Sequence, residues 1–489
     1  MRTARLPALA LAAASAVVGV TALAALPACG GDDSAVPAVD ILDQLRAIPQ
    51  IASVQELQTS QTGYRYFMIQ FDQPVDHDHP EGEHFHQMAT LIHRDAHAPM
   101  MLVHTGYGNW YFDLPVEPTK LLQANQLVVE HRFFRASRPT GSVSDWDDLT
   151  IAQAAADHHA IVQALRPLYD GAWIETGASK GGMTSVYHRR FYPDDVDGTL
   201  AYVAPISFGA PDYRYDAQID SVGPPACRQA IRDLQVDLLT NRRQMLIDRT
   251  TSQAVARGHS YNRITIPAAV ESAVVSLEWS FWQYEGAQSC PTVPPVTASD
   301  AQVWAFLDQV SPVSSSSDFD LIEFEAYDFQ AEEELGYPGT MDEHLMGLLQ
   351  FPPEAYDGAY PPGVPIPTYR PEVMPDIDGW VRAHGDRLIF LYGEWDPWSG
   401  GKFELGDATD SLRVIAPMAP HGAGLGDLTE PDREAVLVKL ADWTGVTPAA
   451  PSARVAERTA PGARSAFDGG LRRDLPRPPS AWIRLRLGR

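Results

Sequence analysis

Strands and helices are predicted to alternate between residues 147 and 205, and few folds accommodate that order. Apolar residues recur at helical spacing over residues 147–168, a short apolar run covers 172–175, a second helix is predicted over 180–191, and another apolar run covers 200–205. A strand, a helix and a second strand in this rhythm form a parallel sheet whose two faces are covered by helices. With 45% apolar and 20% charged residues in 489, the composition is globular, which excludes collagen, coiled coils and wholesale disorder.

The alternation extends to both sides of this segment. Residues 64–71 and 84–93 are expected to form an antiparallel pair at the sheet edge, and residues 100–104 and 126–130 two short buried strands. The alternation stops near Gly209. After a long interruption, two more strands and a closing helix are predicted over residues 387–391, 412–416 and 431–443.

The interruption, residues 211–378, is mostly helical, aromatic and acidic in sequence, which indicates an insertion rather than a continuation of the sheet. We therefore predict an α/β domain in two parts, residues 61–210 and 379–447, split by a mainly helical cap. Residues 29–60 are predicted to be a linker. Residues 448–489 are rich in Ala, Pro, Gly and Arg without an apolar period, so we expect a disordered basic tail there.

Residues 1–28 are predicted to be a lipoprotein-type signal peptide. Two arginines precede an uncharged apolar run that ends before Cys29, and the residues around this cysteine resemble the site at which bacterial lipoproteins are cleaved and lipidated. Cleavage elsewhere and an uncleaved anchor are the alternatives, because the run is long enough to span a bilayer. All three predict export, as a cell-envelope lipoprotein or a secreted protein, with membrane contact only through the anchor. In an oxidising compartment the remaining Cys227 and Cys290 could pair as a disulfide.

The formal net charge of −26 restricts the partners of the chain. Nucleic acids are held by clustered Lys and Arg, so a protein this acidic is not expected to bind them. The cap alone, residues 211–378, has 26 acidic residues and 9 arginines, hence a charge of −17. Such a surface over a binding site would attract ammonium-bearing molecules, although a solvated helix surface is the simpler explanation.

The pentapeptide Gly177-Ala178-Ser179-Lys180-Gly181 has the G-x-S-x-G pattern and lies between a predicted strand and a predicted helix. A sharp strand-to-helix turn exposes the serine hydroxyl above the sheet edge, and the flanking glycines let the backbone pass closely. Ser179 is therefore the predicted nucleophile, and the N–H of Lys180, at the helix N-terminus, is a predicted oxyanion donor. A glycine-rich turn with an ordinary serine is the alternative.

A nucleophilic serine needs a base and an orienting carboxylate, which on this type of sheet follow it in the order acid, then histidine. Asp396 comes directly after the penultimate predicted strand, and His421 follows the last one. Because the carboxyl ends of parallel strands meet at one sheet edge, both should converge on Ser179. Glu394 is a rival acid that lies closer to the strand end.

The second oxyanion donor is expected from the loop after the strand over residues 100–104. This loop, residues 105–109, contains two glycines that permit close backbone approach. The N–H of Gly106 or that of Tyr107 is the candidate, and a plain turn is the alternative.

Six histidines fall within 21 residues and include H-x-H pairs of the kind that bind zinc: His77, His79, His84, His86, His93 and His97. No cysteine is near, two of the six alternate along a predicted strand, and the segment precedes the predicted catalytic core. A surface or hairpin role is therefore favoured over a metal site, and no metal or cofactor is expected.

Several segments together carry a resemblance to one family: residues 177–184, 189–193, 197–205, 76–77, 105–107, 129–134, 281–284 and 392–398. They resemble the secreted bacterial tripeptidyl aminopeptidases, serine peptidases distantly related to the prolyl carboxypeptidase and dipeptidyl-peptidase group. The resemblance covers about residues 64–443. It implies an α/β-hydrolase fold with a helical cap, a triad of Ser179, Asp396 and His421, and the removal of short peptides, expected to be tripeptides, from free N-termini.

Peptide substrates with free N-termini require a partner for their ammonium group. Glu130 is the candidate, because a carboxylate near the pocket can pair with it, and an ion pair with Arg132 is the alternative. Four aromatic residues of the insertion are candidates for lining a pocket for apolar or prolyl side chains, or else for core packing: Trp279, Trp282, Tyr327 and Phe329. The competing functions are a carboxylic-ester hydrolase on the same fold and a noncatalytic envelope lipoprotein that binds peptides.

Overall fold

The computed structural model describes residues 39–451 apart from residues 111, 141–142 and 340–341. The predicted leader, Cys29 and most of the predicted basic tail lie outside the described residues, so these expectations stay predictions.

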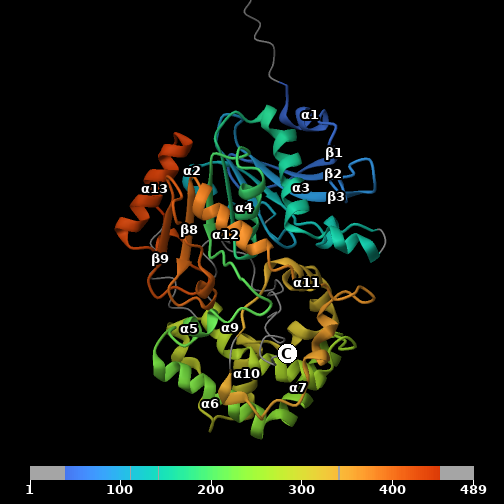
Figure 1. The fold of residues 1–489 in the computed structure, drawn as a ribbon, viewed down its shortest axis with the longest axis vertical. Helices are drawn as coiled ribbons and strands as arrows, with labels where there is room; N and C mark the ends of the chain where they lie inside the picture. Colours follow the sequence, from blue (N-terminus) through green and yellow to red (C-terminus); the bar gives the residue numbers. More distant parts are fainter. Residues whose placement is uncertain (1–38, 111, 141–142, 340–341, 452–489) are drawn as a thin grey trace, which may run out of the picture. The chain divides into compact units, whose positions relative to one another are not determined.

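A nine-stranded sheet forms the centre of the described chain (Figure 1), in the strand order β1-β2-β3-β5-β4-β6-β7-β8-β9. The first three strands and the β3–β5 pair are antiparallel, and all the other neighbours are parallel. This mostly parallel sheet, covered by helices, has the α/β-hydrolase fold that was expected. The strands are β1 Ile51–Leu57, β2 Arg65–Pro74, β3 His84–His93, β4 Met100–His104, β5 Asn125–Val129, β6 Trp173–Ala178, β7 Gly198–Tyr202, β8 Leu388–Gly393 and β9 Leu412–Ala416.

Both faces of the sheet are apolar, because consecutive residues of a strand point to opposite sides. Met101 and Val103 of β4 pack with α2 and α13 on one face, whereas Met100 and Leu102 pack with α3 on the other. Helices α4 and α12 continue the second face. The covering helices are α1 Ile41–Arg46, α2 Glu117–Leu122, α3 Ile151–Leu165, α4 Lys180–Phe191, α12 Val373–His384 and α13 Glu430–Thr444.

Two expectations about the first part of the sheet are wrong. Residues 41–57, expected to belong to a linker, fold as α1 and β1, and β1 pairs with β2. The edge strand is therefore β1, and β2 and β3 are second and third. The half-buried residues of β1 are Ile51, Val54 and Leu57, so the strand has no period-two pattern, and its pairing with β2 is irregular between Ile51 and Ser53.

Two boundaries also differ from the expected ones. Helix α3 begins at Ile151, because the side chain of Thr150 caps it by accepting from the N–H of Gln153 at 3.2 Å. The expected end of the cap at residue 378 falls inside α12. This helix packs against α4, where the Arg190 guanidinium donates to the Asp376 carboxylate at 3.1 Å, and so it belongs with the sheet.

The insertion between β7 and α12 is mainly helical (Figure 1). One hydrophobic core runs from α4 and the loop at Tyr107 into these helices, so the cap shares its core with the sheet domain. The cap helices are α5 Tyr215–Ile219, α6 Pro225–Asn241, α7 Arg243–Arg257, α8 Ile266–Val275, α9 Leu277–Tyr284, α10 Asp300–Val310 and α11 Asp318–Gln330.

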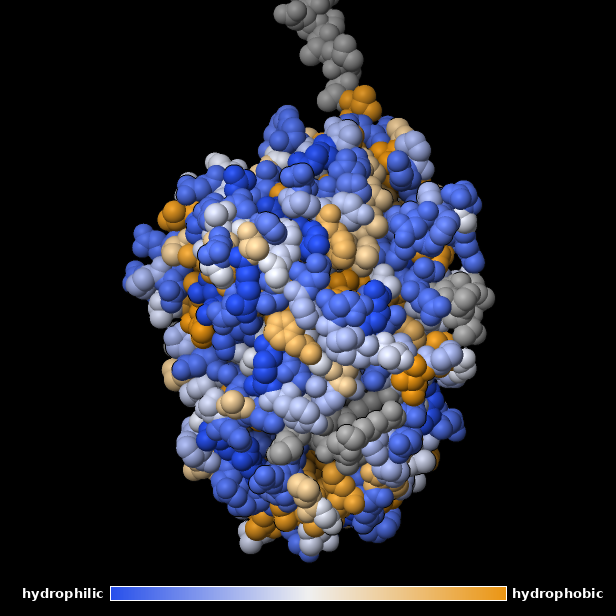
Figure 2. Space-filling view, viewed as in Figure 1, coloured by the Kyte–Doolittle hydropathy of each residue, from blue (hydrophilic) through white to orange (hydrophobic). Residues whose placement is uncertain are grey.

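Hydrophilic residues predominate on the face drawn in Figure 2, where apolar residues form small separate groups. Within the described part of the chain, none of the helices is both long enough and apolar enough to cross a membrane.

The cap contains a disulfide between Cys227 and Cys290, as the sequence suggested. The bond closes a loop of 63 residues. Because such a crosslink restricts the unfolded chain, replacing both cysteines by serine should lower the free energy of unfolding by about 2–4 kcal/mol. Denaturant unfolding of the wild type and the double variant would measure this. An unchanged midpoint in the oxidised protein would contradict the expectation.

Candidate active site

Ser179 sits on a sharp turn between β6 and α4. Its backbone has φ 56° and ψ −125°, a conformation that is strained for a residue with a side chain. The neighbouring glycines are required by space: a Cβ on Gly177 would lie 2.3 Å from Gly181, and one on Gly181 would lie 2.2 Å from the carbonyl oxygen of His104. The turn therefore has the geometry of a nucleophile elbow.

Asp396 and His421 are in direct contact. Nδ1 of His421 lies 2.7 Å from Oδ2 of Asp396, whose side chain is fully buried, while Oδ1 accepts from the N–H of Trp398 at 3.0 Å. The rival Glu394 points elsewhere, because its carboxylate accepts from the N–H of Met418 at 2.7 Å. The structure thus pairs the histidine with Asp396.

The cap holds the loops that carry both residues. The N–H of His421 donates to the carbonyl oxygen of Gln283 in α9 at 3.1 Å. The side chain of Gln218 in α5 donates to the carbonyl oxygens of Glu394 and Asp396, each at 3.0 Å. No local sequence pattern indicated these contacts, since they join segments that are far apart in the chain.

The phenol of Tyr107 lies close to the Ser179 hydroxyl, and its pKa is raised well above its ordinary value, mainly by burial. Nε2 of His421 is buried and has no hydrogen-bond partner among the described residues. Ser179 and His421 are therefore not bonded to each other here. The free Nε2 is the nitrogen that a general base needs, and in unliganded enzymes the bond from serine to base often forms only with substrate.

The loop after β4 packs against the first turn of α4. Gly106 has φ +69°, and a Cβ there would lie 2.6 Å from the backbone of Lys180. Of the two predicted donors in this loop, the N–H of Tyr107 already donates to the Thr105 hydroxyl at 3.2 Å. Close packing of this kind is what an oxyanion hole requires of the loop, and a glycine is needed for it.

The prediction that Glu130 binds substrate is wrong. One of its carboxylate oxygens accepts from the N–H of Asn109 at 2.8 Å, and the other accepts from the hydroxyl and the N–H of Ser137 at 2.9 and 3.1 Å. The side chain is buried, and burial raises the pKa of its carboxyl. Glu130 therefore shapes the loops behind the site. The alternative partner Arg132 binds Asp157 instead.

Three of the four aromatic candidates belong to the core. Trp279 and Trp282 are fully buried, Trp279 between Tyr215 and Trp398, and Trp282 against Trp395. Their prediction as pocket residues is wrong, as is that of Phe329, which packs on Trp146. The structure favours core packing because helix α9 is surrounded on all sides.

Tyr327 does lie beside the site. Its ring centroid is 5.7 Å from that of Tyr107, and the charge of Asp328 in the same helix acts on both phenols. Asp328 is 8% exposed. A cap carboxylate therefore acts through space on Tyr107, and the sequence did not indicate it because one acid among 26 in the cap carries no distinguishing pattern.

Histidines of the β2–β3 region bind separate carboxylates rather than one another. The pairs are His77 with Asp157, His79 with Asp76, His84 with Asp72 and His97 with Asp170. These contacts support the predicted hairpin role.

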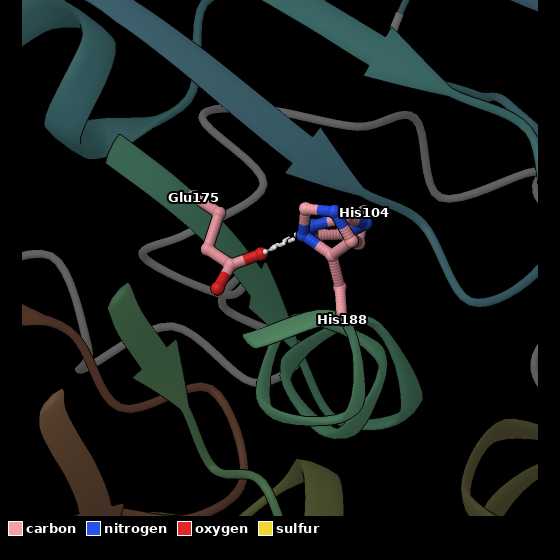
Figure 3. Close-up of side chains that lie close together, drawn as sticks. All are labelled: His104, Glu175 and His188. Atoms are coloured by element: carbon pink, nitrogen blue, oxygen red, sulfur yellow. Dashed lines mark hydrogen bonds and ion pairs between the residues drawn. The ribbon is translucent and has the colours of Figure 1, made fainter. Parts of the chain in front are cut away.

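A buried group of polar residues from β4, β6 and α4 includes His104, Glu175 and His188 (Figure 3). Oε2 of Glu175 contacts Nε2 of His104 at 3.0 Å and Nδ1 of His188 at 2.7 Å, and the other His188 nitrogen contacts Asp195 at 3.1 Å. Their ligand atoms are close enough to hold a metal ion, but these hydrogen bonds already use them. The group joins the end of β4, strand β6 and helix α4, the three elements that carry the site.

This group should make stability depend on pH. Burial alone would raise the pKa of Glu175 and lower that of His188. Opposite charges outweigh burial, so that His188 and His104 lower the pKa of Glu175 to about 2, and Glu175 and Asp195 raise that of His188 to about 9. The stabilisation by His188 is thus complete below pH 6.5 and is lost as the pH rises toward 9. That by Glu175 is complete above pH 4.5 and is lost as the pH falls toward 2.

Replacing His188 by glutamine should lower the free energy of unfolding at pH 6 by about 3–5 kcal/mol, because two buried carboxylates lose their cation. It should also flatten the decline in stability between pH 6.5 and 9. His159 is the matched control: it contacts the same Asp195 oxygen at 2.8 Å but is 37% exposed, so H159Q should cost less than about 1 kcal/mol. Denaturant unfolding across this pH range measures both, and an equally steep decline in H188Q would refute the assignment.

Comparisons with known proteins agree with this geometry. The sequence profile of the family described as PS-10 peptidase S37 matches residues 34–482. A prolyl tri/tetrapeptidyl aminopeptidase of Streptomyces mobaraensis is 37% identical over 446 residues, which cover 90% of this chain and 92% of the relative. The mouse lysosomal Pro-X carboxypeptidase is 30% identical over 160 residues, or 29% of this chain and 33% of that protein.

Among solved structures, a peroxisomal alpha-beta-hydrolase from Saccharomyces cerevisiae aligns with a TM-score of 0.35 at 12% identity, over 78% of this chain and 89% of that one. This likeness is too weak to carry an argument. The family profile, by contrast, spans most of the chain, and the elbow serine and the Asp396–His421 pair lie within it. The chain belongs to the PS-10 peptidase S37 family of serine peptidases.

Proposed function

We propose that this chain is an exported serine aminopeptidase that releases tripeptides from the free N-termini of peptides. The observation that carries the proposal is the contact between Asp396 and His421, which leaves Nε2 of the imidazole available while Ser179 occupies a nucleophile elbow. The likeness to a prolyl tri/tetrapeptidyl aminopeptidase over 92% of its length supports the substrate class.

In the proposed mechanism, the Ser179 hydroxyl forms a hydrogen bond to Nε2 of His421, which takes the proton as the hydroxyl attacks the peptide carbonyl. Asp396 holds the imidazole and stabilises its protonated form. The N–H of Lys180 and a donor from the loop at Gly106 receive the oxyanion. His421 then protonates the leaving amine, and a water molecule, activated by the same base, releases the acyl tripeptide.

Asp328 is the proposed partner of the substrate ammonium. It replaces Glu130 in this role, because its charge in the cap acts on the phenols of Tyr107 and Tyr327, and its carboxylate can make a charge-assisted hydrogen bond to an ammonium. The negative charge of the cap as a whole supports the approach of such substrates.

Asp328→Asn should lower kcat/KM for free-amine peptides by about 10-fold to 100-fold, mainly through KM, since a hydrogen bond to a charged group contributes about 1.5–3 kcal/mol. Glu323→Gln is the matched control. It removes one negative charge from the same helix, but its carboxylate binds Arg135 at 3.0 Å, so kcat/KM should change less than about threefold. Steady-state kinetics on both variants measure the difference. Equal losses would contradict the assignment, because they would show that Asp328 acts only as one of the negative charges of the cap.

A substrate panel tests the function itself. Purified protein is assayed on a tripeptidyl chromogenic amide with a free amine, its N-acetyl form, the corresponding dipeptide and tetrapeptide amides, and a nitrophenyl ester. The proposal predicts the highest kcat/KM for the free-amine tripeptide. Preference for the blocked peptide contradicts it, and preference for the ester indicates a carboxylic-ester hydrolase instead.

Export, with or without a lipid anchor at Cys29, is part of the proposal. Its support is the apolar run before Cys29 and the Cys227–Cys290 disulfide, since such bonds persist in oxidising compartments. Cell fractionation of the wild type and of Cys29→Ser tests it: a lipid-anchored enzyme is retained by membranes through Cys29, whereas a released one is found in the medium in both cases.

A further inference from the structure

The side chain of Lys180 has an unusual place for an amine. Lys180 is the first residue of α4, directly after the elbow serine, and it is 2% exposed. Its Nζ donates to the carbonyl oxygen of Gly106 at 2.7 Å. The residue whose N–H is one predicted oxyanion donor therefore binds, through its side chain, the loop that supplies the other.

Stability does not explain a lysine at this position. The Nζ atom lies over the faces of Tyr107 and Phe134, 5.6 and 5.5 Å from their ring centroids, and burial lowers its pKa. Glu334 acts on it only through space, and its carboxylate binds the N–H of Ile151 at 2.7 Å and Arg370 at 3.1 Å. Burying an amine without a contacting carboxylate is unfavourable, so another requirement must hold it there.

The bond from Lys180 holds the oxyanion loop at the carbonyl oxygen of Gly106. On either side the loop is held by protein atoms, since the Thr105 hydroxyl bonds to the carbonyl oxygen of Tyr107, which also accepts from the N–H of His131 at 2.9 Å. The Gly106 carbonyl has Lys180 as its contact, and Gly106 itself is in the left-handed region at φ +69°. Nζ thus restrains the backbone of Gly106, whose own N–H is the candidate donor that does not bind the Thr105 hydroxyl.

We propose that the Lys180 side chain is a positioning residue that holds the loop at Gly106 against the start of α4, so that both oxyanion donors point at one oxygen. This inference rests on the proposed serine-peptidase mechanism but not on the choice of substrate. Lys180 would then contribute to both parts of the oxyanion hole. Its backbone N–H is one donor, and its side-chain amine positions the loop that carries the other donor. The amine need not touch the substrate.

The test compares Lys180→Met with Gln330→Leu. Methionine keeps the length of the stem without a donor. Gln330 lines the same small internal cavity as Lys180, is 1% exposed, and has no bond from its side-chain amide to a described residue. It therefore controls for the loss of a buried polar group away from the loop. Lys180→Gln, which keeps an N–H donor, serves as the conservative variant.

Two rates are measured: hydrolysis of the free-amine tripeptidyl amide and covalent labelling of Ser179 by a fluorophosphonate, which needs the oxyanion hole but no peptide specificity. K180M should lower kcat about 100-fold, the loss typical of one oxyanion donor, with KM within about threefold. Labelling should slow to the same degree, K180Q should recover at least part of both rates, and Q330L should match the wild type.

A folded K180M that keeps kcat and the labelling rate within about threefold of the wild type overturns the proposal. So does a fall in K180M that Q330L shares, because that would show a packing effect. If K180M does not fold, K180Q decides alone: glutamine keeps a donor but is shorter than lysine, so kcat should fall by between about threefold and 100-fold with KM preserved, and an unchanged kcat overturns the proposal. If the wild type fails on free-amine peptides yet its labelling depends on Lys180, the substrate assignment is wrong and the positioning role stands.

Discussion

Replacing Ser179 by alanine is expected to abolish peptide hydrolysis. Without the hydroxyl no acyl-enzyme can form, and His421 has no proton to accept from a nucleophile held at the elbow. Removal of the nucleophile from serine-peptidase triads lowers kcat by about 10⁶. The remaining rate comes from substrate binding and the oxyanion hole, acting on water. Kinetics on a free-amine tripeptidyl amide, with the melting temperature as a check of folding, would measure the loss.

Ser185 provides the control for this substitution. It lies in α4, the helix that follows the elbow, and is fully buried, and its hydroxyl donates back to the carbonyl oxygen of Gly182 at 2.7 Å. S185A should therefore keep kcat within about threefold while removing one local hydrogen bond. More than one per cent of wild-type kcat in S179A, or fluorophosphonate labelling of that variant, would show that another residue is the nucleophile.

Asp396→Asn is expected to have the second largest effect. The carboxylate accepts from Nδ1 of His421, which keeps the proton on that nitrogen and leaves Nε2 as the base. An asparagine amide in this place can donate to Nδ1 and so favours the wrong tautomer. The corresponding change in a related triad lowers kcat by about 10⁴ with the geometry intact. The loss should appear in kcat at neutral pH, with KM little changed.

Glu394→Gln is the matched control for Asp396→Asn. Glu394 is two residues away on the same loop, and its carboxylate only accepts from the N–H of Met418. A glutamine oxygen can accept the same bond, so kcat should stay within about threefold. If E394Q were as inactive as D396N, the pairing of His421 with Asp396 would not be the catalytic one.

The contacts between cap and triad give the cap a second role beyond covering the site. Gln283 binds the backbone of His421, and Gln218 binds the loop of Asp396. The cap helices therefore hold the loops that carry the base and its orienting acid. The buried group around Glu175 and His188 joins β6 to α4, the two elements on either side of the elbow. Motion of the cap relative to the sheet would therefore shift both loops that carry these triad residues.

Much of the fold was predictable because its signals are local. The buried strands β4 to β9 are short apolar runs, and the observed β9, Leu412–Ala416, has the expected bounds. Helix α4, Lys180–Phe191, also begins and ends as expected. Strand β1 escaped detection because its half-buried residues do not alternate, and its pairing with β2 is a contact at a distance in sequence. The boundary of the cap, which precedes α12 instead of falling at residue 378, was likewise decided by the packing of α12 on α4.

In the candidate site, too, some features were predictable from the sequence and others depended on tertiary contacts. The sequence by itself determined the elbow around Ser179, the order of Ser179, Asp396 and His421, and the need for glycine at Gly106, because these follow from strand ends and from the space that a backbone turn requires. Only the tertiary structure decided between Asp396 and Glu394, enclosed Glu130, and brought Asp328 and the Lys180 amine to their places. Those choices depend on which side chains meet across elements far apart in the chain, and burial and hydrogen bonding settle that only once the chain has folded.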